Sequence, residues 1–333
     1  MIYRAAVIGL GKIGWQAEQD PVRPKPASHV GAWQNLPGQA ELVGAADADP
    51  GRLAEFLGTV SEGVICSTGV DPVVIGADIV SVATPPSTHR LIVEACAAAK
   101  VRLVICEKPL ALTSKDALAM VEACEASGTI LLVNHWRRFE PGLRGAQACL
   151  QDRIGMPTRV AATYCQGLWT GGTHMVDVLS WFFGEVGWVS GWSAGSSNED
   201  GTEDGADMVL WFRNGVRAMV TSLDIRSYVE FSLTIHGTKG AFEVDAYGLH
   251  TRWWGTDDFY PLASGYRRRI LSSGQGAASV SPLARMAEHA VNVLDGVETP
   301  CSTGRDGLAA VQILAAVERS VATHGSPIVP GTA

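Results

Sequence analysis

The chain has 333 residues, of which 47% are hydrophobic and 18% are charged, so it can bury a sizeable core and general disorder is excluded. Its formal net charge of −8 argues against a nucleic-acid backbone or an anionic membrane as the main partner. Seven scattered cysteines without a C-x-x-C pair favour free thiols over a disulfide framework, and we expect no metal site. Because neither a signal-like N-terminus nor an apolar run near ~18 residues is present, we expect a cytoplasmic protein that does not span a membrane.

The first part of the chain alternates short apolar runs with amphipathic ones. Expected strands cover residues 3–9, 41–47, 77–85, 101–107 and 128–134. Expected helices between them cover residues 49–58, 88–100 and 114–128. Buried runs rich in Val, Ile and Ala that are separated by helices are typical of a doubly wound parallel sheet. We therefore predict an α/β protein whose residues 1–133 form a dinucleotide-binding Rossmann domain.

A glycine-rich turn follows the first expected strand. The stretch GLGKIG places Gly9, Gly11 and Gly14 in the G-x-G-x-x-G arrangement, with Lys12 and Ile13 between them. These glycines permit a tight turn and a close approach of backbone N–H groups to a pyrophosphate at a helix N-terminus. Since the motif lies between a strand and a helix, it predicts dinucleotide binding by these five residues.

An acidic residue ends the second expected strand. Asp47 would hydrogen-bond ribose hydroxyls and repel a 2′-phosphate, so we expect NAD as the cofactor, with NADP less favoured. Asp47 follows Gly14 by 33 residues, against the usual ~20. The three prolines within Gln16–Ser28 indicate an insertion that accounts for the excess. Alternatively, Asp47 only caps the following helix, and Arg52 nearby leaves NADP open.

The third expected strand ends in VATPPSTH. Thr84, Pro85 and Pro86 would form a stiff turn at the edge of the sheet where a cofactor lies. His89 is either structural or placed near the edge of the cofactor. All four are candidates for cofactor binding.

The fourth expected strand ends in Glu107, Lys108 and Pro109. A lysine at the end of a buried strand is costly to desolvate unless the site requires it. The carboxyl edge of a parallel sheet is where nicotinamide would lie, so Glu107 and Lys108 are candidate cofactor contacts. From the residues alone, a purely structural role for Lys108 remains open.

Longer strands appear after residue 133, joined by tight turns that contain glycine. We expect strands at residues 159–167, 207–215, 216–224, 229–246 and 249–255, a loop at 195–207, and closing helices at 283–296 and 304–325. This pattern is typical of a mostly antiparallel sheet. Residues 134–333 are therefore predicted to form a second α/β domain with a large open sheet, for substrate binding and oligomerisation.

The ordered motifs resemble the Gfo/Idh/MocA oxidoreductases, the family of glucose–fructose oxidoreductase and inositol dehydrogenase. The resemblance rests on GLGKIG, ATPPSTH, CEKPLALT, NHWRRFEP, GGTHMVDVLSWFFG, HGTKGAFEV and TGRDGLAAVQILAAVERS. It implies hydride transfer between nicotinamide and a carbohydrate or cyclitol carbon, and a homodimer or homotetramer formed through the C-terminal sheet. It also implies that Lys108 and His174 are the catalytic residues.

The implied chemistry assigns each residue a task. His174, with an ordinary pKa of ~6.5, would take the hydroxyl proton, and Asp177 at i+3 could orient it if both lie on a helix. Lys108 would donate a hydrogen bond to the reacting oxygen, and Glu107 would hold Lys108 or line the cofactor. A cis bond between Lys108 and Pro109 is a further hypothesis. Without the resemblance, His174 and Asp177 could be a surface or capping pair.

A group of aromatic, amide, hydroxyl and charged residues is predicted to bind substrate, although ordinary packing would explain each one. Aromatic faces stack on sugar C–H surfaces, and an arginine suits a carboxylate or phosphate group. The candidates are Asn134, Trp136, Arg138, Tyr164, Trp169, Thr170, Thr173 and Asp177. Thr170 stands where many family members carry an aspartate, four residues before the histidine, and it cannot act as a carboxylate base.

Three functions remain open. The first is an NAD(P)-dependent oxidoreductase of a sugar, sugar acid, sugar nucleotide or cyclitol, acting on a secondary alcohol or ketone carbon. The second retains NAD and uses transient sugar oxidation for elimination or glycosidic cleavage. The third is a non-catalytic NAD-binding regulatory protein.

Overall fold

The computed structural model describes residues 1–60, 63–195, 204–245, 248, 250–258, 267–275 and 281–332. Backbone contacts divide the chain into two compact units, Met1–Phe139 with Val280–Val311, and Glu140–Ser279 with Gln312–Ala333. Residues 280–311 thus belong to the first unit although they lie near the end of the chain. Two consecutive ranges, such as 1–133 and 134–333, cannot describe this arrangement. The division into domains 1–133 and 134–333 stays a prediction.

The first unit contains a parallel sheet of six strands in the order β3-β2-β1-β4-β5-β6. Its strands are β1 Tyr3–Ile8, β2 Ala40–Ala46, β3 Ile65–Ser67, β4 Ile79–Val82, β5 Leu103–Cys106 and β6 Ile130–Val133. The five expected strands are confirmed, and β3 was not expected because three partly exposed residues leave no apolar run to recognise. The strand order is that of a Rossmann fold.

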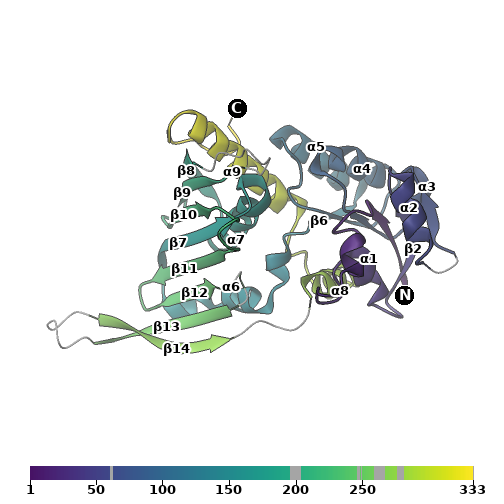
Figure 1. Cartoon of the computed structure of the whole chain (residues 1–333). Coiled ribbons are helices and arrows are strands. Elements are labelled where there is room, and N and C mark those ends of the chain that lie inside the picture. The colour runs from purple at the N-terminus through teal and green to yellow at the C-terminus, as the bar shows by residue number, and fades with distance from the viewer. Residues whose placement is uncertain are drawn as a thin grey trace. The chain divides into compact units, whose positions relative to one another are not determined.

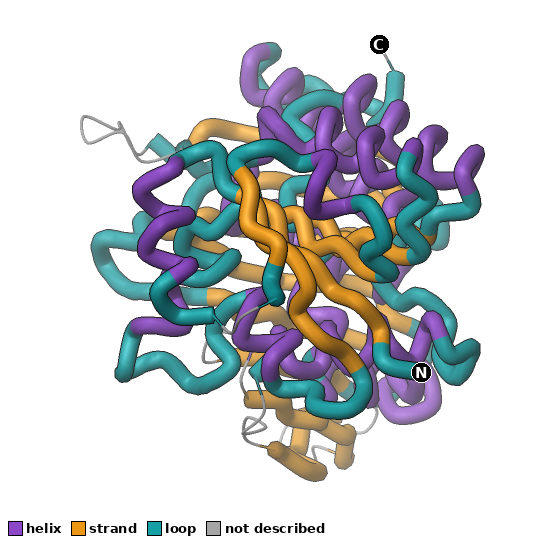
Figure 2. The backbone as a smooth tube through the Cα atoms, turned by 90° about the vertical axis from the view of Figure 1, so that its right-hand side faces the viewer, coloured by secondary structure: helices purple, strands orange, loops and turns teal. Residues whose placement is uncertain are grey.

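Helices cover both faces of the parallel sheet (Figure 2). In Figure 1 the pair α4 and α5 lies on the opposite side of the sheet from the pair α1 and α8. The helical segments of this unit are η1 Gln16–Gln19, α1 His29–Gln34, α2 Pro50–Leu57, α3 Asp71–Val74, α4 Pro86–Ala98, α5 Ser114–Ser127, η2 Trp136–Phe139 and α8 Pro282–Leu294. Because both faces are covered, strand residues of either parity are buried, as in Ala6 and Val7 of β1.

The second unit is built on an eight-stranded sheet in the order β14-β13-β12-β11-β7-β10-β9-β8. Its strands are β7 Pro157–Cys165, β8 Val186–Ser193, β9 Ala206–Phe212, β10 Arg217–Leu223, β11 Phe231–Gly237, β12 Ala241–Asp245, β13 His250–Asp258 and β14 Arg267–Gln275. Only the β7–β10 pair of this sheet is parallel, so the expected, mostly antiparallel sheet is confirmed. β8 contains two glycines and β14 begins with three arginines, which is why neither was expected as a strand.

One face of this sheet carries helices. Figure 1 shows α6 (Pro141–Ile154), α7 (Thr173–Phe183) and α9 (Gly304–Ala322) on the same side of the strands. Side chains therefore alternate along β7, where Val160 and Ala162 are buried and Ala161 between them is exposed. The predicted loop at 195–207 falls mostly on residues 196–203, which lie outside the described residues. None of the described helices combines the length and the hydropathy that a membrane crossing requires.

Candidate functional site

Three loops of the first unit leave neighbouring strands at the same edge of the parallel sheet. Backbone hydrogen bonds fix their starts: Gly9 N–H donates to Ala46 (2.7 Å), Ala83 N–H to Ile8 (2.7 Å) and Glu107 N–H to Val82 (2.9 Å). The glycine turn follows β1, Thr84 follows β4 and Lys108 follows β5. From the neighbouring strands β1 and β4, the chain adds later strands outward on opposite sides, β2 and β3 beside β1 and β5 and β6 beside β4. Doubly wound sheets bind their ligands in the crevice at the carboxyl ends of the strands at such a point.

The glycine turn fits a dinucleotide phosphate. Gly9 has φ +94°, and a Cβ there would lie 2.7 Å from the Ala83 backbone. A Cβ on Gly14 would lie 1.8 Å from the carbonyl oxygen of Gly9. A Cβ on Gly11, in contrast, would meet no described atom within 4 Å, so the space beside its backbone is open. The first and third glycines are therefore required by packing, and the second leaves room for a phosphate to approach.

The helical turns that follow the glycine turn are interrupted, and α1 continues their hydrogen-bond ladder. Trp15 N–H and Ala17 N–H donate to the carbonyls of Gly11 and Lys12 (2.9 and 2.8 Å). The next two carbonyls, of Ile13 and Gly14, accept from His29 and Val30 (both 3.0 Å). His29 N–H therefore makes the hydrogen bond that follows the one of Ala17 N–H in this ladder. The 11 residues 18–28 lie between these two donors in the sequence and loop out.

This looped segment, residues 18–28, confirms the expected insertion and explains the spacing to Asp47. Subtracting its 11 residues from the 33 between Gly14 and Asp47 leaves 22, near the usual ~20. The Glu18 carboxylate accepts from Ala27 N–H (2.8 Å) and Ser28 Oγ (2.9 Å), and Lys25 Nζ donates to three carbonyls of residues 17–20. The segment is thus a hydrogen-bonded structure of its own.

Asp47 is buried at the end of β2 and holds the glycine turn. Its carboxylate accepts from Leu10 N–H (2.7 Å), Asp49 N–H (2.9 Å) and Arg52 Nη1 (2.9 and 3.0 Å). Burial by itself raises the pKa of this carboxyl, but the backbone hydrogen bonds of Asp49 and Leu10 and the Arg52 guanidinium outweigh it, so the pKa lies below its ordinary value. Helix α2 is capped by Asp49, not by Asp47.

The turn after β4 is tied to the loop that carries Lys108. Thr88 Oγ1 donates to Pro85 O (2.8 Å) and lies 2.9 Å from Thr84 Oγ1 at the start of α4, which includes Pro86. The fully buried His89 ring lies 2.8 Å from the Thr84 carbonyl and 3.1 Å from the Leu110 carbonyl. His89 therefore joins two loops of the edge, and a direct contact with a cofactor stays a prediction.

Glu107 is a buried carboxylate directly before Lys108. Its Oε1 accepts from Asn134 Nδ2 (2.6 Å) and from His29 Nε2 (3.0 Å), and its Oε2 accepts from Lys108 N–H (3.2 Å). Burial raises the pKa of this carboxyl, but the hydrogen bond and charge of His29, the Asn134 amide and the nearby Lys108 lower it more, so the net pKa is below its ordinary value. Lys108 is half-buried, and its bond to Pro109 is cis, which confirms that hypothesis.

The segment after β6 is more buried than a substrate-facing loop would require. Asn134 is 3% exposed and bonds Glu107, as described. Arg138 is also 3% exposed, and its Nη1 donates to the Cys301 carbonyl (2.8 Å) and lies 3.2 Å from Asp306. Trp136 is half-buried, with the Arg137 guanidinium 4.1 Å from the centre of its ring. Their predicted role in substrate binding stays a prediction, and these contacts give Asn134 and Arg138 a structural role.

The second unit gathers its predicted residues around the start of α7. A single π-helical turn, Leu168–Gly172, directly precedes the helix and includes Trp169 and the exposed Thr170. Thr173 begins α7, so His174 lies in its first turn with Asp177 three residues later, which confirms the expected helical spacing. π-helical turns are rare and often occur at functional sites.

Two of these residues are held by neighbouring elements of the second unit. The buried Tyr164 hydroxyl donates to the Ala206 carbonyl (2.9 Å) and accepts from Ala206 N–H (3.0 Å). Trp169 Nε1 donates to Glu318 (2.6 Å). A Cβ on Gly172 would lie 3.2 Å from the Tyr164 ring, so this ring packs against the π-helical turn that precedes His174. Its hydroxyl is already satisfied by protein.

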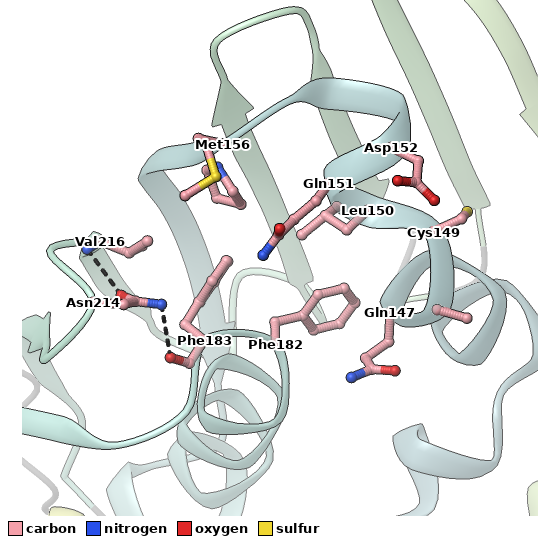
Figure 3. A pocket seen from close by; sticks show the side chains of 12 residues that line it. Gln147, Cys149, Leu150, Gln151, Asp152, Met156, Phe182, Phe183, Asn214 and Val216 are labelled. Carbon is pink, nitrogen blue, oxygen red and sulfur yellow. Dashed lines mark hydrogen bonds between the residues drawn. The ribbon is translucent and has the colours of Figure 1, made fainter.

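Two further features of the described residues concern the site. Among the described residues, no group of three or more His, Cys, Asp or Glu side chains could hold a metal ion. A cavity of about 340 Å³ lies between α6, α7 and the turn after β9 in the second unit, and Figure 3 shows Phe182 and Phe183 facing Gln151 and Met156 across it. None of the predicted site residues lines this cavity.

The sheet order, the open glycine turn and the polar strand ends define the first unit as a dinucleotide-binding Rossmann unit. The chain belongs to the Gfo/Idh/MocA oxidoreductase family. Residues 3–135 match the family model described as "Oxidoreductase family, NAD-binding Rossmann fold", and residues 150–243 match the "GFO/IDH/MocA C-terminal domain". The resemblance seen in the motifs is therefore confirmed, together with the predicted fold class.

Characterised relatives match about half of the chain. D-apiose dehydrogenase from Paraburkholderia graminis is 33% identical over 178 residues, which cover 48% of this chain and 47% of the relative. Inositol 2-dehydrogenase 1 from Saccharopolyspora erythraea is 34% identical over 166 residues, covering 48% of this chain and 45% of the relative. The match to these two relatives thus spans less than half of their own length.

A solved structure matches the whole fold. The WlbA dehydrogenase from Bordetella pertussis, crystallised with NADH and UDP-GlcNAcA, covers 100% of this chain and 99% of its own at a TM-score of 0.81. Its sequence identity is 22%, so the likeness concerns the fold alone.

Proposed function

We propose that this protein is an NAD-dependent dehydrogenase or ketoreductase acting on a secondary alcohol or ketone carbon of a sugar, sugar acid, sugar nucleotide or cyclitol. The observation that carries the proposal is the row of strand ends, where the open turn at Gly11, the anchored Asp47 and the half-buried Lys108 share one edge of a Rossmann sheet. The names of the relatives, an apiose and an inositol dehydrogenase, support a polyhydroxylated substrate.

NAD is the proposed cofactor, held by Gly9, Gly11, Gly14 and the Asp47 edge, and when bound it supplies the nicotinamide that exchanges hydride. Lys108 donates a hydrogen bond to the reacting oxygen and stabilises the negative charge that develops there. His174 takes the hydroxyl proton at a ring nitrogen during oxidation and returns it during reduction. Asp177, one turn along α7, orients the imidazole.

The first experiment is a panel of sugars, uronates, cyclitols and sugar nucleotides, followed by NADH absorbance with NAD and NADP in parallel. Turnover with at least one compound and NAD is expected. Absence of turnover across the panel contradicts the proposed function, and a preference for NADP contradicts the role given to Asp47.

Lys108→Met tests the catalytic assignment. We expect NAD binding to stay within about twofold of wild type and turnover to fall by about 10²–10³-fold, the cost of removing one donor from a developing oxyanion. Lys115→Met, at an exposed lysine of α5, is the matched control and should leave both unchanged. Equal turnover in the Lys108→Met variant and wild type would remove Lys108 from the mechanism.

A second candidate function is favoured by Thr170 and by one relative. The relative, 2,7-anhydro-N-acetylneuraminate hydratase from Mediterraneibacter gnavus, is 31% identical over 146 residues, and its name denotes addition of water. An enzyme of that kind would retain NAD and oxidise its substrate only transiently. It would form product from an anhydro sugar or glycoside without accumulating NADH, which chromatography of the reaction mixture measures. Any turnover excludes the third alternative, a regulatory protein without catalysis.

We also propose that the face of the eight-stranded sheet without helices joins copies of this chain into a homodimer or homotetramer. Residues of β9, β10 and β7 that pair in register form a continuous strip on this face: Val209, Met219 and Ala161. Met219 is 67% exposed. An uncovered apolar strip of this kind is typical of an interaction surface.

A further inference from the structure

The carboxylate of Glu107 is enclosed by donors from three separate parts of the first unit. Lys108 N–H follows it in the chain, Asn134 lies after β6, and His29 begins α1. The His29 ring is fully buried, and Glu107 is 8% exposed. Desolvating a carboxylate is costly unless donors replace the lost water, so this cluster is maintained by the hydrogen bonds that it contains.

The looped segment 18–28 is what brings a histidine to this place. Helix α1 resumes the ladder at His29, and Ser28 caps it by accepting from Gly31 N–H (3.0 Å). Ser28 is itself fixed by the Glu18 carboxylate (2.9 Å). The start of α1 is therefore clamped on both sides, which sets the direction in which the imidazole leaves the helix.

Stability alone does not account for a histidine at position 29. An ionised carboxylate can only accept, so Nε2 carries the proton and donates to Glu107. Nδ1 of the same ring is buried and has no hydrogen-bond partner among the described residues. A buried polar atom without a partner lowers stability, whereas an aliphatic side chain at this position would carry no such cost. What the histidine specifically provides is the bond to Glu107.

We propose that His29 is a positioning residue for Lys108, acting through Glu107. With His29 and Asn134 on Oε1, the carboxylate is held in one rotamer, and its Oε2 then accepts from the backbone N–H of Lys108. The point from which the Lys108 side chain leaves the sheet edge is thereby fixed. The inference rests on the proposed function, in which Lys108 acts on the reacting oxygen, and it adds a residue 78 positions away from Glu107 to the catalytic apparatus.

Two amide substitutions test this inference as a matched pair. His29→Gln places an amide donor at the reach of Nε2, whereas His29→Asn places it one carbon shorter, at the reach of Nδ1. Both keep a polar side chain, and His29→Leu removes the donor altogether. Gln34→Ala, at an exposed position of the same helix away from its start, is the control. Thermal unfolding of each variant reports whether it is folded.

The kinetic readout separates positioning from folding. We expect kcat of the folded His29→Asn and His29→Leu variants to fall by about 10- to 100-fold, with KM for NAD within about twofold, since small displacements of a catalytic group have effects of that size. His29→Gln should recover kcat to within about threefold of wild type. Equal kcat in the Gln and Asn variants, or a loss that Gln34→Ala shares, would overturn the proposal.

A second readout does not depend on turnover. Hydrogen exchange of the peptide that contains the Lys108 amide should accelerate in His29→Asn and His29→Leu but not in His29→Gln, because that amide donates to Glu107. If exchange of this peptide is unchanged in all variants, His29 does not fix the Lys108 amide through Glu107. If wild type turns over no compound of the panel, the proposed function fails while the exchange comparison still decides whether His29 fixes the start of the Lys108 loop.

Discussion

At the scale of single residues, the sheet edge contains two buried carboxylates with the same electrostatic design. Asp47 and Glu107 each end a strand region, and burial raises the pKa of each. In both cases hydrogen bonds from amides and from a basic side chain outweigh burial and lower the pKa overall. Both groups therefore remain ionised at neutral pH and can serve as fixed negative charges beside the glycine turn and Lys108.

The lowered pKa of Glu107 predicts a specific dependence of stability on pH. A carboxyl whose pKa is lower in the folded state stabilises the fold fully above its unfolded value of about 4.3 and loses that contribution as the pH falls through the folded value. The free energy of unfolding of wild type should thus decrease more steeply below about pH 4.3 than that of Glu107→Gln. Denaturant titrations across the acidic range measure it. Parallel curves, or the same change in the surface control Glu122→Gln, would refute the assignment.

The pairing of Asp47 with Arg52 predicts how cofactor choice can be reversed. Arg52 Nη1 donates to both carboxylate oxygens of Asp47, and Nη2 lies 3.5 Å from Asp49, so Asp47→Ser would release the Nη1 side of the guanidinium. A guanidinium with released donors can bind a 2′-phosphate, so the variant should lose NAD affinity by about tenfold and gain affinity for NADP. Titrations with both cofactors measure the ratio. Adding Arg52→Ala should abolish the gain; if NADP binding persists in the double variant, Arg52 is not its source.

At the scale of elements, the resumed helix predicts that the looped segment can be removed without breaking the Rossmann unit. Deletion of residues 18–28 joins Ala17 to His29, which already occupy successive places in the ladder. The variant loses the Ser28 cap and the Ser281–Pro26 hydrogen bond, so we expect its free energy of unfolding to fall by only about 2 kcal/mol, with NAD still bound.

A deletion that is longer by one residue serves as the control. Removing residues 17–28 joins Gln16 to His29 and shifts the register of α1 by one position, which rotates its buried face away from the sheet. Unfolding and NAD titration should show a much larger loss than in the 18–28 deletion. Equal behaviour of the two variants would show that the ladder does not continue across the segment.

At the scale of the whole molecule, the uncovered sheet face predicts assembly into oligomers. Met219→Glu introduces a charge into the exposed apolar strip and should shift the protein to a smaller species in sedimentation or light scattering. Met156→Glu is the matched control, because Met156 is 62% exposed but lies at the cavity on the helix side. An unchanged mass for Met219→Glu, or an equal effect of both variants, would contradict an interface on the strip.

The sequence predicts the local features of the molecule well. Apolar runs identify the five longer strands of the parallel sheet, and the glycine spacing identifies the turn after β1, because both are properties of consecutive residues. β3 was missed, since Ile65–Ser67 is too short to show a pattern. The helix that begins at Thr173 entered only as a condition for Asp177 to share a face with His174, and the structure meets that condition.

The contacts between distant residues were not predictable in the same way. Glu107 is 78 residues from His29, and Arg138 meets the carbonyl of Cys301, 163 residues later. No pattern in a single sequence joins such pairs, so neither the place of His29 beside Glu107 nor the contact of Arg138 with Cys301 could be expected. The one available signal for His29 was its place at the first turn of the helix after the prolines.

The looped segment also makes the nucleotide turn accessible to engineering. The two ends of the segment lie next to each other, because Ala17 and His29 make successive hydrogen bonds of one ladder. A domain whose own termini lie close together can therefore be inserted into the segment without separating its ends. Val22 in this segment is 88% exposed, and His29 and Val30, directly after the segment, donate to the carbonyls of Ile13 and Gly14. A fluorescent protein grafted at Val22 would thus be connected through a short hydrogen-bonded path to the phosphate-binding turn. Cofactor binding would then be read as a change in emission, without observing turnover.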